Sequence, residues 1–192
     1  MAYIETPYKI EDYVNAIGQI TIQQSLLEDA MADSIGVLIG EDESANIRIT
    51  ASEPFLNLLR LLAVLFKYRI TDKNQIKRFD IIAKNLKDSD TARNVNIHAA
   101  IILVEFSDKT IVFKNRYSKF NIANFEIDDT PPTIEALNKI ALNIRDGRSD
   151  LRNIVKSNIS IIRRHQSNAI KLTRALNKAK NQFQQKQKSK IV

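Results

Sequence analysis

Apolar residues recur every three or four positions along most of the chain, which is the spacing of one face of a helix. The segment from Ile10 to Leu38 predicts one long helix with an irregularity near Gly18. The next helix is expected over 55–68, with Ser52 as its N-cap. Because residues 55–68 are apolar on most faces, this helix is expected at the centre of a bundle.

A third helix is expected from Asp72, whose side chain can cap it. The polar stretch 87–91 is interpreted either as its last exposed turn or as a short break, and helical character is expected to resume over 92–99. The predicted apolar stripe of this helix consists of Ile76, Phe79, Ala83 and Leu86.

The last helical region begins at the sequence Pro131-Pro132-Thr133. From Leu137 to Ile162 an apolar repeat of about 3.5 residues crosses Gly147 without losing phase. A continuous helix is therefore the preferred prediction, although glycine costs about 1 kcal/mol relative to alanine inside a helix. The alternative is a break, with Ser149 capping a new helix.

Two segments differ from this helical pattern. Residues 101–106 and 110–117 are β-branched and aromatic, and they flank a polar tripeptide at 107–109 that is typical of a hairpin connection. A two-stranded ribbon is not stable alone, so it must pack on the helices. The predicted fold is mainly α, a bundle of four to five helices with a small two-stranded β-ribbon after the third helix.

Residues 1–170 are predicted to form this single domain, and 171–192 a frayed or disordered basic extension. The chain of 192 residues has 29 Lys and Arg against 22 Asp and Glu, a net charge of +7. The last acidic residue is Asp150, so residues 151–192 hold eleven cations and no acid, and the preceding 150 residues have a net charge of −4. This asymmetry indicates an anionic partner at one end of the molecule.

Composition excludes several kinds of site. The chain has no cysteine, two histidines and four glycines, which excludes disulfides, Cys-based zinc sites, His-rich metal sites and glycine-rich phosphate loops. No metal and no cofactor are therefore predicted. The longest apolar run, about 56–66, is too short for a membrane span, and the N-terminus lacks the order of a signal peptide. We expect a cytoplasmic protein that does not contact membranes.

The carboxylate pairs are interpreted as charged faces exposed to solvent rather than as catalytic groups. They are Glu28-Asp29, Asp88 with Asp90, and Asp128-Asp129.

One constellation can carry chemistry: Arg93, Asn94 and His98, near the end of the third predicted helix. Arginine suits a phosphate because its planar fork stays charged and donates two hydrogen bonds. Histidine can exchange a proton with a ribose hydroxyl near neutral pH. Arg93 and His98 lie about 140° apart around a regular helix, so a shared ligand needs a bent helix or a dimer seam. Together they are the minimum equipment for RNA cleavage without metal.

The Arg-Asn-x-x-x-His segment resembles the Arg-x4-6-His motif of the HEPN superfamily, and the order of elements resembles that of a group of largely uncharacterised bacterial proteins. The resemblance implies a helical bundle, dimerisation through the motif face and, in toxin and defence members, RNase activity. It places Arg93 and His98 at catalytic positions and Asn94 at the polar position beside the arginine. In the alternative reading, Arg93 and Asn94 bond the ends of neighbouring helices and His98 packs a helix junction.

The basic C-terminal segment can bind phosphate backbones of RNA or other nucleic acid, and such binding would depend strongly on salt. It has almost no aromatic residue, so base stacking is not expected there. The alternatives are an acidic protein partner or a solubilising tail. The residues predicted to contact nucleic acid are Arg163, Arg164, Lys171, Arg174, Lys178 and Lys180.

Overall fold

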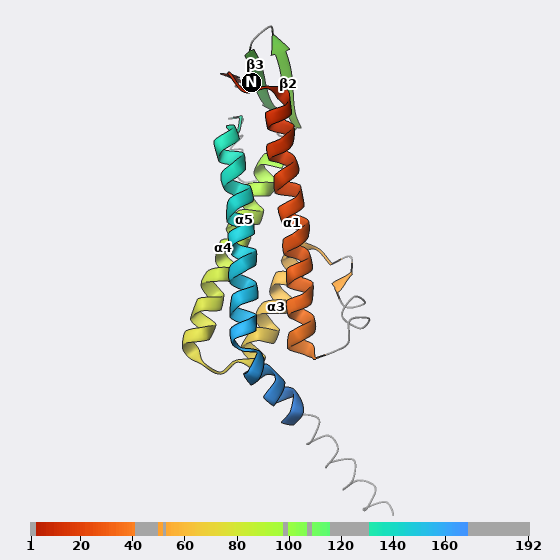
Figure 1. The fold of residues 1–192 in the computed structure, drawn as a ribbon, viewed down its shortest axis with the longest axis vertical. Coiled ribbons are helices and arrows are strands. Elements are labelled where there is room, and N and C mark those ends of the chain that lie inside the picture. Colours follow the sequence, from red (N-terminus) through yellow and green to blue (C-terminus); the bar gives the residue numbers. More distant parts are fainter. Residues whose placement is uncertain are drawn as a thin grey trace, which may run out of the picture.

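The computed structural model describes residues 3–40, 50–51, 53–97, 100–106, 109–115 and 131–168. These residues form an elongated helical bundle with a small antiparallel sheet at one end (Figure 1). The predicted fold class is confirmed, because the chain is mainly helical and a β-hairpin follows the third described α-helix. The α-helices are α1 (Ile10–Ile39), α3 (Phe55–Arg69), α4 (Lys73–Ile97) and α5 (Ile134–Ser157).

Helix α1 runs without interruption past Gly18, so the predicted irregularity there is wrong. It begins where the Asp12 carboxylate accepts a hydrogen bond from the backbone N–H of Lys9, at 2.9 Å. It ends at Gly40, which has a positive φ of 81° that glycine adopts without strain.

Helix α3 starts directly after Pro54, which holds the N-cap position, and the predicted cap Ser52 lies outside the described residues. The prediction for α4 is confirmed at its start, since Asp72 Oδ1 accepts hydrogen bonds from the backbone N–H of Asn74 (2.7 Å) and Gln75 (3.3 Å). The helix continues through 87–91, so the proposed break in that stretch is wrong.

Helix α5 is continuous through Gly147, as the preferred prediction had it. Thr133 caps it by accepting a hydrogen bond from the Ala136 N–H at 3.2 Å. A Cβ atom added at Gly147 would lie 2.6 Å from Cδ2 of the buried Leu86, so glycine is needed for the close approach of α4. Ser149 caps nothing; its hydroxyl donates to the Arg145 carbonyl inside the helix.

The sheet has three strands in the order β1-β3-β2. The predicted hairpin is confirmed as β2 (Ala100–Phe106) and β3 (Lys109–Asn115), paired antiparallel. The sequence did not predict β1 (Tyr3–Thr6), which pairs with the other edge of β3. A four-residue strand gives too short a pattern to identify, and its partner lies far away in the sequence.

One hydrophobic cluster joins all four helices. The rings of Phe66 and Phe79 stack at 4.4 Å between centroids and connect α3 to α4. After a turn at Asn158 the chain is helical again over 159–168, and Ile162 there is fully buried. The first part of the basic C-terminal segment therefore packs on the bundle.

Candidate functional site

Arg93 and Asn94 lie near the end of α4, and both bind one carboxylate. Asp90, one turn earlier on the same helix, accepts a hydrogen bond from Arg93 Nη2 at 3.0 Å on Oδ1 and from Asn94 Nδ2 at 3.1 Å on Oδ2. Asp90 is only 5% exposed. A single buried acid thus orients both polar side chains of the motif.

This arrangement differs from the alternative interpretation of Arg93 and Asn94 as residues that bond the ends of neighbouring helices. Both side chains instead bond a residue of their own helix. The interpretation of Asp90 as a solvent-exposed carboxylate is also wrong, whereas its neighbour Asp88 is exposed and pairs with Lys84. The sequence did contain the signal, because an acid three residues before an arginine on a helix can form an ion pair with it.

The Arg93 side chain is partly exposed to solvent although it binds Asp90. Its side chain is 21% exposed, and its buried Nε has no hydrogen-bond partner. His98 falls between the last residue of α4 and the first of β2, outside the described residues.

A polar cleft of about 360 Å³ lies between α4 and α5. Arg93 is not among its lining residues, which include Asp88, Asp146 and Asp150. An acidic lining repels phosphate, so this cleft is a poor site for a nucleic-acid backbone.

At the end of the bundle away from the sheet, cations from two parts of the sequence lie close together. Asn158 Nδ2 donates to Gln75 Oε1 at 3.4 Å, which places the start of α4 beside the segment that follows α5. Gln166 Nε2 donates to the Val37 carbonyl at 2.9 Å, which places residues 159–168 against the end of α1. Both contacts join residues far apart in the sequence.

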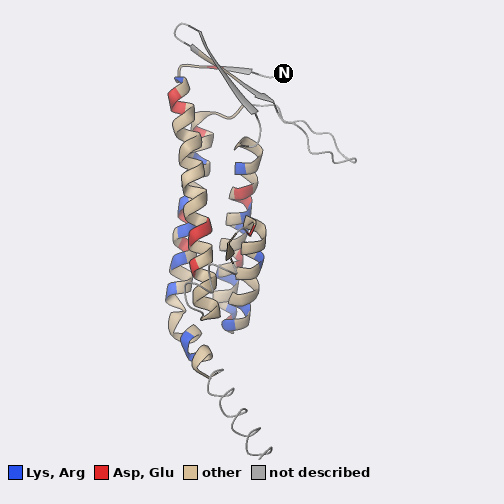
Figure 2. Ribbon diagram, turned by 90° about the vertical axis from the view of Figure 1, so that its right-hand side faces the viewer, with Lys and Arg blue, Asp and Glu red and all other residues tan. Residues whose placement is uncertain are grey.

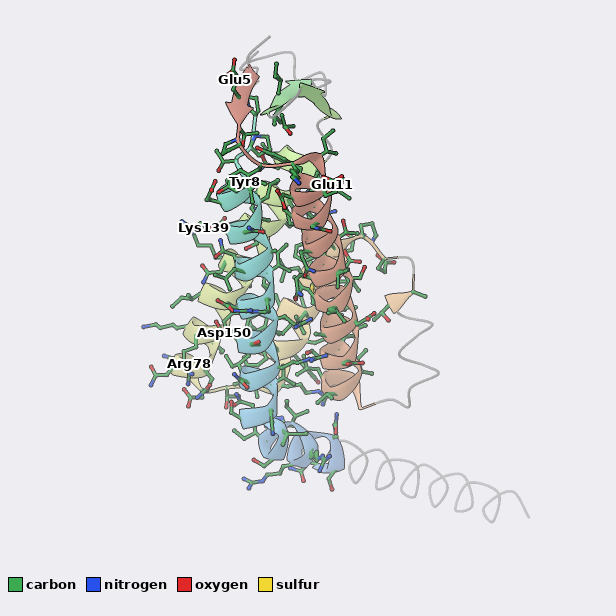
Figure 3. The ribbon with its side chains drawn as sticks, turned by 45° about the horizontal axis from the view of Figure 1, so that its top comes forward. Glu5, Tyr8, Glu11, Arg78, Lys139 and Asp150 are labelled. Carbon is green, nitrogen blue, oxygen red and sulfur yellow. The ribbon has the colours of Figure 1, made fainter. Side chains whose placement is uncertain are left out.

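We call this surface the basic end and define it by its exposed cations, which are Lys73, Lys77, Arg78, Lys156, Arg163 and Arg164. Within the described part of the chain none of the six forms an ion pair. Blue segments gather at the lower end of the bundle in Figure 2, and Arg78 points away from the helices in Figure 3. The nearby Asp72 is engaged as the cap of α4.

The structure thus describes two of the six residues predicted to bind nucleic acid, Arg163 and Arg164, and both are exposed. The other four, Lys171, Arg174, Lys178 and Lys180, lie outside the described residues. Sequence reasoning missed the three cations at the start of α4. Acidic residues flank them at 72 and 80, which is typical of an ordinary solvated face, and the contact of Gln75 with Asn158 has no local sequence signal.

The sheet end of the bundle carries charges of both signs, with Lys9 and Lys139 among its acids. All charged residues of α1 are acidic, and Glu5 and Glu11 lie near the sheet in Figure 3. There the Tyr8 hydroxyl donates a hydrogen bond to the Glu135 carboxylate. This bond lowers the pKa of Glu135 and raises the pKa of Tyr8, because it stabilises the charged carboxylate and the protonated phenol.

The described residues contain no group of three or more His, Cys, Asp or Glu side chains that could hold a metal ion. None of the helices formed by those residues is both long and apolar enough to cross a membrane. Comparisons of the chain with family models, curated proteins and solved structures give no match.

Proposed function

We propose that this protein binds nucleic acid through its basic end. The observation that supports this is a set of six exposed cations, none ion-paired within the described part of the chain, that two long-range contacts bring to one end of a bundle. Unpaired Lys and Arg on a rigid surface are the groups that neutralise phosphates and release counterions.

The test is the salt dependence of binding. Two triple variants of the full chain remove cations from each half of the basic end: Lys73→Gln/Lys77→Gln/Arg78→Gln and Lys156→Gln/Arg163→Gln/Arg164→Gln. Each is expected to reduce the slope of log affinity against log salt by about 2 to 3, since each lost phosphate contact contributes about 0.7 to 0.9. Fluorescence anisotropy with labelled oligonucleotides measures it.

A control triple with the same loss of charge, Lys84→Gln/Lys139→Gln/Arg145→Gln, changes exposed cations of α4 and α5 outside the basic end. It should leave the slope nearly unchanged. Equal effects of all three triples would mean that net charge alone governs binding, and the proposed interface would be wrong. Deleting 171–192 measures what the rest of the basic segment adds.

A second candidate function is RNA cleavage without metal, with Arg93 as phosphate anchor and His98 as acid and base. The observation that favours it is the Asp90 carboxylate, which orients Arg93 and Asn94 together while Arg93 Nε is left without a partner. Preoriented donors stabilise developing charge better than mobile ones. The HEPN resemblance adds the expectation of a dimer and of a toxin or defence role, and solution mass tests the dimer.

The Arg93 variant for this test must keep a positive charge beside the buried Asp90. Arg93→Ala would leave Asp90 buried without its cation, so lost cleavage could reflect misfolding. Arg93→Lys keeps the charge but loses the planar fork, and His98→Ala removes the acid and base. Purified protein should cleave RNA in the presence of a chelator, and both variants should abolish cleavage. Unchanged cleavage in both would contradict the assignment.

A further inference from the structure

Among the residues that the structure describes, an exposed aromatic side chain, Tyr68, lies next to the basic end. It lies in the last turn of α3 and is 73% exposed, the largest exposed fraction among the large apolar and aromatic residues that the structure describes. Aromatic rings usually contribute to a core or an interface, because leaving them in water forgoes the gain from burial. Tyr68 is therefore open to contact with a ligand in the part of the chain that the structure describes.

The ring is also held in place. The Arg69 guanidinium lies 5.4 Å from the centroid of the Tyr68 ring, within the range of a cation–π contact. Arg69 is itself fixed, because its Nε donates to the Leu38 carbonyl at 2.9 Å and its Nη2 to the Ile39 carbonyl at 3.4 Å. One side of the ring thus faces a cation anchored to the end of α1, and the high exposure leaves the rest open to solvent.

The surroundings of the ring are those of the proposed interface. The first cation of the basic end, Lys73, follows Tyr68 by five residues, and the end of α1 that holds Arg69 also receives Gln166 from the 159–168 segment. The sequence had predicted no stacking for the basic segment itself, since it has almost no aromatic residue. The fold supplies the missing ring from α3.

We propose that the Tyr68 ring is a stacking platform for one base of a single-stranded nucleic acid whose phosphates contact the basic end. Every base has a π-face, so a fixed aromatic ring beside cations binds single strands with little sequence preference. A duplex keeps its bases stacked on one another and cannot offer one to the ring. This inference rests on the proposed nucleic-acid binding and adds the class of ligand.

The natural chain has no tryptophan, which makes a direct test possible. Tyr68→Trp places the only indole at the platform, and Tyr8→Trp places it at the sheet end as a matched control (Figure 3). Oligo(dT) and oligo(U) should quench the emission of Trp at position 68, and a duplex of equal phosphate concentration should not. The control chain should show no quenching with any probe.

Affinity provides the second readout. Tyr68→Ala should weaken binding of oligo(dT) or oligo(U) roughly fivefold to 100-fold, the range for loss of one stacked base. Tyr68→Phe retains the ring and should bind within about twofold of the natural chain. Neither change should alter duplex affinity. Because Tyr68 is exposed, both variants are expected to fold, and unfolding curves check this.

The outcomes separate the two proposals. Binding of oligonucleotides without quenching at position 68, or equal affinity of Tyr68→Ala and the natural chain, would overturn the platform and leave the basic end as an interface. Absence of any binding by the natural chain would overturn both. Comparing oligo(dT) with oligo(U) shows whether DNA or RNA is preferred.

Discussion

Arginine side chains have different environments at the two ends of the bundle. Near the sheet, Arg93 is bound to the buried Asp90, and its charge is balanced within the fold. At the basic end, Arg78, Arg163 and Arg164 are exposed and unpaired in the described part of the chain. Arg93 therefore stabilises the fold and exposes only part of its side chain, whereas the arginines of the basic end have no such role and are exposed to a ligand.

This difference predicts opposite responses to mutation. Removing one partner of a buried pair leaves a charge without compensation, so stability falls. Removing an exposed cation costs the fold almost nothing but weakens binding of an anion. Unfolding measurements on variants test that contrast.

Asp90→Ala should have the largest effect. It leaves Arg93 without its carboxylate and Asn94 without its acceptor, and the expected loss is about 2 to 3 kcal/mol in the free energy of unfolding. The value lies below that of a fully buried pair because Arg93 is 21% exposed and can turn towards water. Urea unfolding measures it.

The matched control is Asp88→Ala, two residues earlier on the same helix. Asp88 pairs with Lys84, but both side chains are more than half exposed. An exposed pair at this spacing contributes about 0.3 to 0.5 kcal/mol, so the change should be small. Equal losses from Asp88→Ala and Asp90→Ala would show that the Asp90 pair is an ordinary surface contact.

Gly147→Ala tests the packing that brings α4 close to α5. Alanine is normally the better helix residue by about 1 kcal/mol, but its Cβ would lie 2.6 Å from Leu86, and overpacking costs about 1 to 3 kcal/mol. We expect a net loss of about 1 kcal/mol. Gly18→Ala, with nothing within 4 Å of the added carbon, should instead stabilise the protein. Stabilisation by both changes would contradict the close contact.

The helices could be predicted from the sequence because their signals are local. The apolar repeat that crosses Gly147 kept its phase, and Thr133 and Asp72 are caps of a familiar kind. Strand β1 could not be predicted, since its stability comes from pairing with β3 rather than from its own four residues.

The site was predictable only in part. Arg93 and Asn94 were identified as polar residues in a helical pattern, but the burial of Asp90, which decides what they bind, cannot be read from the pattern. The basic end depends on the contact between Asn158 and Gln75, two polar residues that no periodicity links. Long-range polar contacts of this kind leave no pattern in a single sequence.

The hydrogen bond from Tyr8 to Glu135 differs from both the buried Asp90–Arg93 pair and the exposed cations of the basic end, because it is formed at an exposed position. The lowered pKa of Glu135 means that its contribution is present above the unfolded value near 4.5 and is lost as the pH falls. The raised pKa of Tyr8 means that its contribution is present below 10.0 and is lost as the pH rises. Tyr8→Phe should therefore lower Tm slightly near pH 7 and by less at pH 3. An equal decrease at both pH values would point to lost packing instead.

Arg163→Gln/Arg164→Gln should have the smallest effect on stability, within about 0.5 kcal/mol, because neither side chain has an ion-pair partner to lose. Like charges crowd this end, so a slight gain in stability is also compatible with the contrast. The same double variant should reduce the salt slope of nucleic-acid binding by about 1 to 2. A loss of stability as large as that of Asp90→Ala would mean that these arginines are structural, and the distinction between the two ends of the bundle would fail.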